Sequence, residues 1–256
     1  MEIAIKVTDL SFVYPDGTIG LNKVSLEIRK GQTVVIIGAN GTGKSTLLLN
    51  LMGIFKGEGE IEIFGMPMNK KSLSEVCGRL GLVFQNPDDQ LFCPTVFDDV
   101  AFGPLNLGYD EETVRQKVKR ALSSVRMERF AERSSHHLSF GEKKRVSIAS
   151  VLSMEPDILL LDEPTGGLDP KSASELLEIL HQLKEEGKTI LTTTHDLYLI
   201  SELADIVFVM GEDKNIVAKD LPHIIFSNRK LLLENNLIHK SRSLYEHPRE
   251  KYNVYQ

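Results

Sequence analysis

Apolar and polar residues alternate along the first part of the chain. The apolar members of three alternating sets are Ile3, Ile5 and Val7, then Val24, Leu26 and Ile28, and finally Ile61 and Ile63. Because successive side chains of a strand point to opposite faces, this period of two predicts strands with one buried face. Turn residues at Pro15-Asp16-Gly17 and Gly57-Glu58-Gly59 separate the sets.

Two short runs are apolar without alternation, VVII at 34–37 and ILLL at 158–161. Such runs are typical of strands that are buried on both faces of a parallel sheet. The segments 190–194 and 206–210 are further strand candidates. Because helical patterns lie between these segments, the chain is predicted to have an α/β core.

The pattern changes between about residues 87 and 150, where helical spacing dominates. Asp110 can cap a helix whose apolar positions share one face, namely Val114, Val118, Ala121, Leu122 and Val125. The opposite face is charged, and we interpret it as a solvated surface formed by Arg115, Lys117, Lys119 and Arg120. This section therefore predicts a helical lobe inserted into the α/β core.

Composition narrows the class of protein. The chain has 256 residues and a formal net charge of −6, which argues against a nucleic-acid partner. Its two cysteines, Cys77 and Cys93, lack metal-ligand spacing. No apolar run reaches the ~18–20 residues of a transmembrane helix, and the first residues do not resemble a signal peptide. A role at a membrane would need a partner that holds this chain there.

The most specific chemical motif matches the pattern GxxxxGK[ST] in full. Its residues are Gly38, Ala39, Asn40, Gly41, Thr42, Gly43, Lys44 and Ser45, followed by Thr46. An apolar strand precedes the motif and a helical pattern follows it. The glycines let backbone N–H groups converge on one point, and a helix N-terminus adds partial positive charge. The motif therefore predicts a phosphate cradle in which Lys44 contacts the β- and γ-phosphates and Ser45 binds Mg²⁺.

A pair of carboxylates, Asp162 and Glu163, follows the apolar run at 158–161. The carboxyl end of a buried strand lies at the edge of the sheet where α/β proteins bind their ligands. Asp162 can hold Mg²⁺, often through water. Glu163 points elsewhere and can act as the general base for an attacking water.

The order of these motifs resembles the ABC ATPases across residues 1–212. LSFGE at 138–142 resembles the signature of that family, usually written LSGGQ, and three basic residues follow it. Gln85, DEPT at 162–165, GLD at 167–169 and His195 match the Q-loop, Walker B motif, D-loop and switch histidine in order and spacing. The resemblance implies a P-loop NTPase fold, with an N-terminal antiparallel β subdomain and a helical subdomain at about 87–150 inserted in the α/β core.

The resemblance also implies ATP and Mg²⁺ as cofactors and a role for each residue in the site of this chain. Tyr14 would stack on adenine, and Thr46 would join Lys44 and Ser45 around the phosphates and metal. Gln85 would sense the metal and the attacking water, with catalytic roles for Lys44, Gln85, Glu163 and His195. His195 would stabilise the γ-phosphate.

Two subunits of such ATPases sandwich two ATP molecules, each between one phosphate loop and the signature of the other subunit. By this resemblance, the nucleotide site of the partner would be completed by four residues of this chain, Ser139, Phe140, Gly141 and Glu142. Phe140 departs from the family pattern, because it replaces the first glycine of the signature pair. A bulky side chain there must point away from the nucleotide.

The segment GLVFQNPDDQLF at 81–92 resembles the ATPase subunits of energy-coupling factor transporters and related cobalt and nickel importers. This resemblance implies a second ATPase subunit and a transmembrane coupling protein that docks near the segment from Gln85 to Phe92. It also implies an indirect link to a substrate-binding membrane protein. The chain would act peripherally at the cytoplasmic face of the cell membrane. Its extension, residues 213–256, would help dimerisation.

Two other classes remain as alternatives. One is an ABC protein without a transport role, such as one that acts in iron–sulfur assembly. The absence of long coiled coils or a second phosphate loop disfavours the DNA-repair and translation types. The other class is a nucleotide-binding regulator that does not hydrolyse ATP, which the intact Glu163 disfavours.

Three histidines near the end of the chain are irregularly spaced, namely His223, His239 and His247. Their spacing favours surface positions over a metal site.

Overall fold

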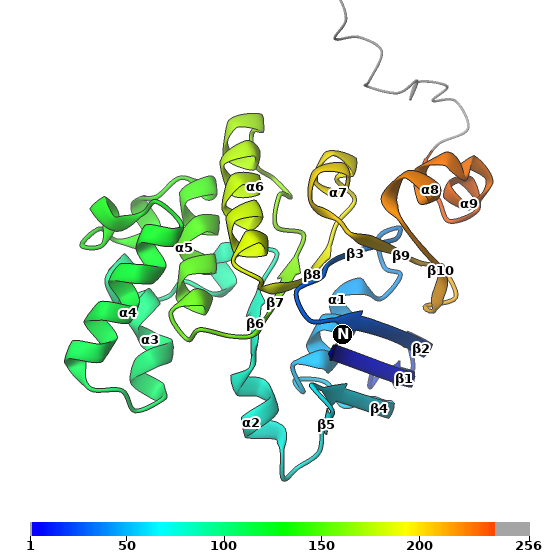
Figure 1. The fold of residues 1–256 in the computed structure, drawn as a ribbon, viewed down its shortest axis with the longest axis horizontal. Coiled ribbons are helices and arrows are strands. Elements are labelled where there is room, and N and C mark those ends of the chain that lie inside the picture. Colours follow the sequence, from blue (N-terminus) through cyan, green and yellow to red (C-terminus); the bar gives the residue numbers. More distant parts are fainter. Residues whose placement is uncertain (1, 239–256) are drawn as a thin grey trace, which may run out of the picture.

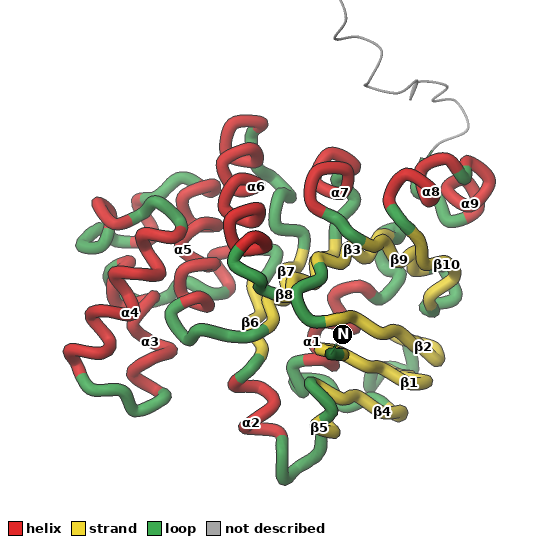
Figure 2. Tube along the Cα trace, in the orientation of Figure 1, coloured by secondary structure: helices red, strands yellow, loops and turns green. Residues whose placement is uncertain are grey.

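Two β-sheets, with one helix between them and further helices outside, make up the fold of residues 2–238, which the computed structural model describes (Figure 1). The side chain of Leu197 lies outside that description. Figure 2 shows the smaller sheet on the right, below the larger one, and a group of helices on the left. This arrangement confirms the predicted α/β fold with an antiparallel sheet and inserted helices.

The smaller sheet is antiparallel and has the strand order β2-β1-β4-β5. Its strands are β1 (Ile3–Val13), β2 (Ile19–Arg29), β4 (Glu58–Ile63) and β5 (Met66–Pro67). Ile5, Val7 and Ile28 are buried, as their alternation predicts. The prediction is wrong for Ile3, which is exposed, because a register shift between Ile3 and Ile5 changes the face of the strand.

The predicted turn at residues 57–59 is also wrong in extent, since β4 already begins at Glu58. Gly59 has a φ of +117° and a Cβ there would lie 2.7 Å from the carbonyl oxygen of Asp9. Glycine is therefore used at this position for a close approach within the sheet. The strands β6 (Leu80–Val83) and β10 (Ile216–Asp220) and the helix α2 (Leu73–Gly78) were not predicted by the sequence pattern.

The larger sheet has the order β10-β9-β3-β8-β7-β6. Its strands are β3 (Thr33–Ile37), β6 (Leu80–Val83), β7 (Ile158–Asp162), β8 (Thr189–Thr193), β9 (Ile206–Met210) and β10 (Ile216–Asp220). All neighbours are parallel except β9 and β10. The four strands predicted at 34–37, 158–161, 190–194 and 206–210 are confirmed as β3, β7, β8 and β9.

Helix α1 (Lys44–Leu51) lies between the two sheets, and its leucines share a core with residues of both. The other face of the larger sheet is covered by α6 (Pro170–Glu185), α7 (Leu197–Leu203), α8 (Pro222–Ser227) and α9 (Arg229–Glu234) (Figure 1). Alternate residues of β3 enter these two cores, Ile36 toward α1 and Val35 toward the helical face. Burial on both faces explains why residues 34–37 of this strand are all apolar.

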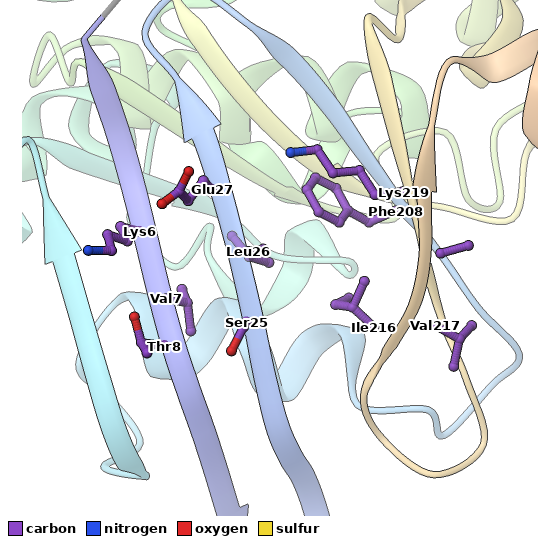
Figure 3. Close-up of a pocket in the computed structure, with 11 residues that line it drawn as sticks. Lys6, Val7, Thr8, Ser25, Leu26, Glu27, Phe208, Ile216, Val217 and Lys219 are labelled. Atoms are coloured by element: carbon purple, nitrogen blue, oxygen red, sulfur yellow. The ribbon is translucent and has the colours of Figure 1, made fainter.

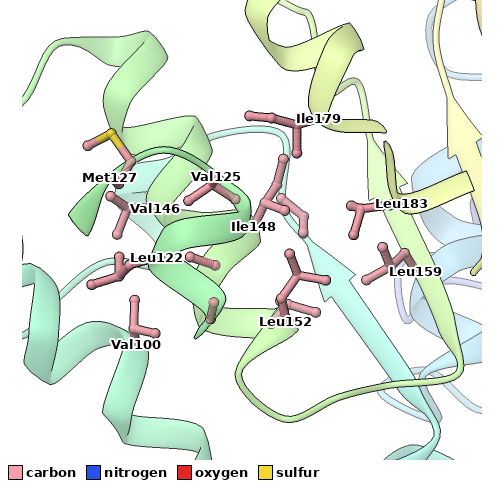
Figure 4. Close-up of a cluster of buried hydrophobic side chains, with 14 of the residues drawn as sticks. Val100, Leu122, Val125, Met127, Val146, Ile148, Leu152, Leu159, Ile179 and Leu183 are labelled. Carbon is pink, nitrogen blue, oxygen red and sulfur yellow. The ribbon is translucent and has the colours of Figure 1, made fainter. Parts of the chain in front are cut away.

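The inserted helices occupy residues between β6 and β7. They are α3 (Val96–Asn106), α4 (Glu111–Ser124) and α5 (Phe140–Leu152), together with the short 3₁₀ turns Pro87–Asp89, Glu128–Phe130 and Ser135–His137. Helix α2 (Leu73–Gly78) precedes β6 and is not part of this insertion. Figure 4 shows that Leu122 and Val146 belong to one buried cluster with Leu159 of β7 and Leu183 of α6. These helices therefore share a core with the larger sheet.

The predicted N-cap of α4 is confirmed, because the Asp110 side chain accepts a hydrogen bond from the backbone N–H of Thr113. The prediction that the charged face of α4 is solvated is wrong at one position. Lys117 is buried, and its Nζ lies 2.7 Å from Oε2 of Glu155, just after α5. Its ammonium also lies 4.7 Å from the centre of the Tyr109 ring. Lysine tolerates this buried position because its long apolar stem packs along apolar surface and its ammonium is paired with a carboxylate.

The carboxyl ends of the parallel strands lie at one edge of the larger sheet. Ile36 of β3 and Asp162 of β7 pair in register with the same residue of β8, Thr193. The segments that follow these strands therefore meet at this edge, where α/β proteins bind ligands. Of residues 2–238, none lies in a helix that is both long enough and apolar enough to span a bilayer.

Candidate active site

The segment between β3 and α1 is a tight loop whose glycines are required by its backbone. Gly41 and Gly43 have φ values of +79° and +104°, a region that residues with a Cβ rarely adopt. A Cβ at Gly43 would lie 2.3 Å from the carbonyl oxygen of Gly20, and a Cβ at Gly38 would lie 2.6 Å from Oγ1 of Thr42. The loop therefore curls as the motif predicts.

Lys44, the first residue of α1, is 7% exposed and lies over this loop. Its Nζ donates hydrogen bonds to the carbonyl oxygens of Gly38 at 2.8 Å and Ala39 at 3.2 Å. Burial lowers the pKa of Lys44, and the carboxylates of Glu163 and Asp162 act in the opposite direction. Its ammonium is therefore held between the loop carbonyls and the carboxylate pair.

Tyr14 lies against the N-terminus of α1 in a small aromatic cluster. Its hydroxyl is 2.7 Å from Oγ1 of Thr46, the third residue of the helix. Its ring meets those of Phe12 and Phe55 edge-on, with centroid distances of 5.0 and 5.7 Å. The structure thus brings the predicted adenine-stacking residue to the phosphate loop. Ser45 is exposed beside these residues.

Asp162 ends β7 at the carboxyl edge, where its Oδ1 accepts a hydrogen bond from Oγ1 of Thr193 at 2.6 Å. Glu163 is 6% exposed and has a φ of +44°, an uncommon conformation for a residue other than glycine. Its backbone N–H donates to the carbonyl oxygen of Thr193 at 3.0 Å. Such strained residues concentrate at functional sites.

Glu163 and His195 form a direct contact. Oε2 of Glu163 lies 2.9 Å from Nδ1 of His195 and accepts a longer hydrogen bond of 3.4 Å from the backbone N–H of the same residue. The His195 side chain is 69% exposed, whereas that of Glu163 is 8% exposed. A fixed, buried carboxylate therefore meets an imidazole that faces solvent.

Gln85 follows β6 and is exposed. The carbonyl oxygens of Phe84 and Gln85 accept hydrogen bonds from Nζ of Lys144, on α5. Burial lowers the pKa of Lys144 to about 8, while Asp162 and Glu163 act to raise it. The backbone at Gln85 is therefore tied to α5.

The signature-like segment forms the N-terminus of α5. Ser139 is the N-cap and forms a capping box with Glu142, whose carboxylate accepts a 2.8 Å hydrogen bond from the backbone N–H of Ser139. A Cβ at Gly167 would lie 3.2 Å from the Phe140 ring. Phe140 thus packs against the loop before α6, at a glycine that leaves room for the ring. Gly141 is equally constrained, since its Cβ would lie 2.7 Å from Oγ of Ser172.

Two contributors to this region were not predicted from the sequence. Thr193 links β8 to both carboxylate residues through its hydroxyl and carbonyl. Lys214, in the turn between β9 and β10, donates a hydrogen bond from Nζ to the carbonyl oxygen of Gly41. A threonine in a strand and a lysine in a polar turn carry no motif, so only the fold brings them to the site.

A separate groove of about 510 Å³ lies between the smaller sheet and β10. Figure 3 shows Thr8 and Ser25 on one side and Ile216 and Lys219 on the other. None of its lining residues belongs to the predicted nucleotide site. The groove and the phosphate loop are therefore distinct features of the molecule.

The oxygen donors near the phosphate loop fit Mg²⁺. This ion prefers oxygen ligands and usually binds through one or two carboxylates together with substrate phosphates. Asp162 offers a carboxylate, Ser45 a hydroxyl and Gln85 an amide oxygen. Within residues 2–238, no group of three or more His, Cys, Asp and Glu side chains could hold a metal on its own. The donor set suits a cation that is bound jointly with nucleotide phosphates.

Comparisons with known proteins agree with this geometry. The model of the ABC transporter family matches residues 21–166. The energy-coupling factor transporter ATP-binding protein EcfA of Methanocaldococcus jannaschii is 48% identical over 236 residues, which make up 91% of this chain and 84% of that protein. The structure of cbiO1 from Clostridium perfringens, part of the ABC transporter complex cbiONQ, is 39% identical, with a TM-score of 0.81 over 93% of this chain and 96% of that one.

A third relative is an ATP-binding cassette that was solved as a dimer in a post-hydrolysis state bound to ADP and Pi. It is 28% identical, with a TM-score of 0.75 over 85% of this chain and 98% of that one. The family match covers more than half of the chain, and it includes the phosphate loop and the carboxylate pair. The chain therefore belongs to the ABC transporter family of ATP-binding proteins.

Proposed function

We propose that this chain is the ATP-hydrolysing subunit of a membrane importer of the energy-coupling factor type. The observation that carries this function is the convergence of a complete phosphate loop, Asp162 and the Glu163–His195 pair at one edge of the larger sheet. The similarity to EcfA and to cbiO1 supports the importer type. The alternative of an ABC protein without a transport role is not favoured by these relatives.

Nucleotide binding uses the loop from Gly38 to Thr46. Its backbone N–H groups and the N-terminus of α1 present partial positive charge to the β- and γ-phosphates. Lys44 exchanges its hydrogen bonds with the loop carbonyls for contacts with phosphate oxygens. Tyr14 packs against adenine. Bound Mg²⁺, held by Ser45, Gln85 and Asp162, would neutralise phosphate charge.

Hydrolysis is assigned to Glu163. A water attacks the γ-phosphorus, the bond from that phosphorus to the β–γ bridging oxygen breaks, and Glu163 accepts the proton of the water. The products are ADP and phosphate. His195 stabilises charge on the γ-phosphate, and its exposed ring is free to turn toward the nucleotide from its contact with Glu163.

A second copy or a related ATPase subunit completes each nucleotide site. The phosphate loop follows β3, whereas α5 belongs to the helices beyond β6, three strands away in the sheet order. Ser139 and Phe140 are exposed at the N-terminus of α5, so residues 139–142 are accessible to the nucleotide of another chain. The dimeric relative with ADP and Pi supports this arrangement. Because the Phe140 ring packs at Gly167, it leaves the N-terminus of α5 accessible to the phosphate of that nucleotide.

The transmembrane coupling protein is proposed to dock beside residues 85–92. Large apolar side chains are exposed there and on the adjoining α3 and its following loop, at Phe92, Phe102, Leu105, Leu107 and Tyr109. Phe92 and Phe102 meet edge-on with centroids 5.0 Å apart. Contiguous exposed apolar side chains of this kind mark interaction surfaces. This docking would hold the chain at the cytoplasmic face of the membrane.

The proposed organisation has an ATPase domain at 1–212 with its helical subdomain at about 87–150, and an extension at 213–256 that helps dimerisation. Ile225 of α8 and Leu232 of α9 pack in the core beside β9. The first part of the extension is therefore anchored to the ATPase fold. His239, His247 and the rest of 239–256 lie outside the described residues.

The importer role can be tested by purification from membranes in detergent. We expect the chain to be recovered in a stable complex with integral membrane proteins. Phe102→Ser should weaken recovery of that complex, whereas Ile3→Ser, at an exposed position in β1, should not. Recovery of the native chain with water-soluble partners alone would contradict the proposal.

A further inference from the structure

Lys144 is fully buried, although lysine is among the residues that are least often found inside proteins. It lies on α5, two residues beyond the signature-like segment at 138–142. Its Nζ donates to the carbonyl oxygen of Phe84 at 3.0 Å and to that of Gln85. Because a buried ammonium needs hydrogen-bond partners, these two carbonyls hold it in place.

The same segment is attached to α5 at its other end. Gln90 donates from Nε2 to the carbonyl oxygen of Ser147 at 2.8 Å and to Oγ of Ser150 at 2.9 Å. The Oε1 atom of Gln90 accepts from the backbone N–H of Phe84 at 3.2 Å, which closes the loop. Lys143 adds an ion pair with Asp88 at 2.6 Å. Residues 84–90 are therefore tied to α5 at both ends.

Lys144 also lies within the electrostatic influence of the catalytic carboxylates. Asp162 and Glu163 favour its charged form against the effect of burial. A cation at this position is thus compatible with the carboxylate pair. A neutral side chain of similar size would leave two carbonyl oxygens without a donor.

We propose that Lys144 is a positioning residue for ATP hydrolysis, which acts by holding the backbone of Gln85 against α5. The inference rests on the proposed ATPase function and on the role of Gln85 in it. Residues 138–142, which would serve the nucleotide of a second copy, form the N-terminus of the helix that carries Lys144. One buried ammonium therefore joins a loop of this chain's own nucleotide site to a segment of the opposing site.

The test compares steady-state ATP hydrolysis and nucleotide affinity of the full chain with those of Lys144→Met and Lys144→Arg. Methionine approximates the four-atom apolar stem of lysine and removes the ammonium with its donors. We expect Lys144→Met to lower kcat at least tenfold, while the affinity for a fluorescent ADP analogue stays within twofold. Lys144→Arg keeps the donors and should recover part of the lost kcat. An unchanged kcat in Lys144→Met would overturn the inference.

A double-mutant cycle with Gln85→Ala separates positioning from general destabilisation. If Lys144 acts through Gln85, the double variant should be no slower than the slower single variant. If the losses in kcat of the two single variants multiply in the double variant, the inference would be overturned. Ile148→Val, also buried on α5, is the matched control and should keep its kcat.

Hydrogen exchange provides a measurement that does not depend on activity. Backbone N–H groups in residues 84–90 should exchange faster in Lys144→Met than in the native chain or in Ile148→Val. Equal exchange would contradict the tie to α5. If Lys144→Met does not fold, the same comparison is made with Lys144→Arg, whose exchange should lie close to native. A native chain without ATP hydrolysis would instead contradict the proposed function.

Discussion

Single residues at the phosphate loop show how closely the sequence is matched to the backbone. Gly43 combines a left-handed φ with a carbonyl oxygen 2.3 Å from where a Cβ would stand. The motif was recognisable from the sequence because these glycines fall at fixed spacings before a lysine. Thr193 and Lys214 were not recognisable, because their roles depend on which strands and turns become neighbours. Lys117 was misjudged because a single charged face does not reveal the partner across the core.

Gly43→Ala should disrupt the phosphate loop. The new methyl group collides with the Gly20 carbonyl in a conformation that alanine adopts poorly. We expect nucleotide affinity to fall at least tenfold, with a lower melting temperature. Titration with a fluorescent nucleotide and a thermal melt would measure both. Gly78→Ala is the control, because nothing lies within 4 Å of its Cβ position. A native-like affinity in Gly43→Ala would contradict the role of this backbone.

At the scale of elements, the α4 N-cap could be predicted and its packing partners could not. Asp110 caps α4 as its position before a periodic helix indicates. Removal of this cap by Asp110→Ala should lower the free energy of unfolding, because the backbone N–H of Thr113 loses its side-chain acceptor. Chemical denaturation would measure the change. Glu111→Gln, in the same first turn, should change stability much less. Equal stability of Asp110→Ala and the native chain would show that the cap is not needed.

The pair between Lys117 and Glu155 links α4 to the residues after α5, and its contribution should depend on pH. The hydrogen bond from Lys117 lowers the pKa of Glu155 from its ordinary value of 4.5. The stabilisation is therefore fully present above pH 4.5 and is lost as the pH falls through the lowered pKa. We expect Glu155→Gln to cost about 1 kcal/mol or less at pH 7, and less below pH 4.5. Denaturation at several pH values would test this, and a cost that grows on acidification would contradict it.

The strands β3 and β7 were predictable because burial on both faces leaves an uninterrupted apolar run at 34–37 and 158–161, whereas β6 and β10 were not predicted. Strand order was not predictable, since β3 lies between β8 and β9 and only the completed sheet shows it. The same order places Asp162 beside Thr193 and the phosphate loop. Local pattern therefore identified the elements and the motifs, and tertiary packing determined which residues meet.

At the scale of the whole molecule, the proposed function makes the chain one half of a nucleotide-driven pair. Its own site contains the phosphate loop, Asp162 and Glu163, whereas residues 138–142 lie on the helices beyond β6. ATP that contacts both chains would favour their closed arrangement, and loss of the γ-phosphate would release it. In this proposal, hydrolysis sets the direction of the cycle, and we assign the general-base step to Glu163.

The most direct test of this account is ATP turnover by the native chain and by Glu163→Gln. The amide keeps the size of the side chain and removes its basicity. We predict that Glu163→Gln binds ATP and forms an ATP-dependent dimer, while its kcat falls at least ~100-fold. Turnover at the native rate in Glu163→Gln would contradict the assignment of Glu163 as the general base and with it the central claim.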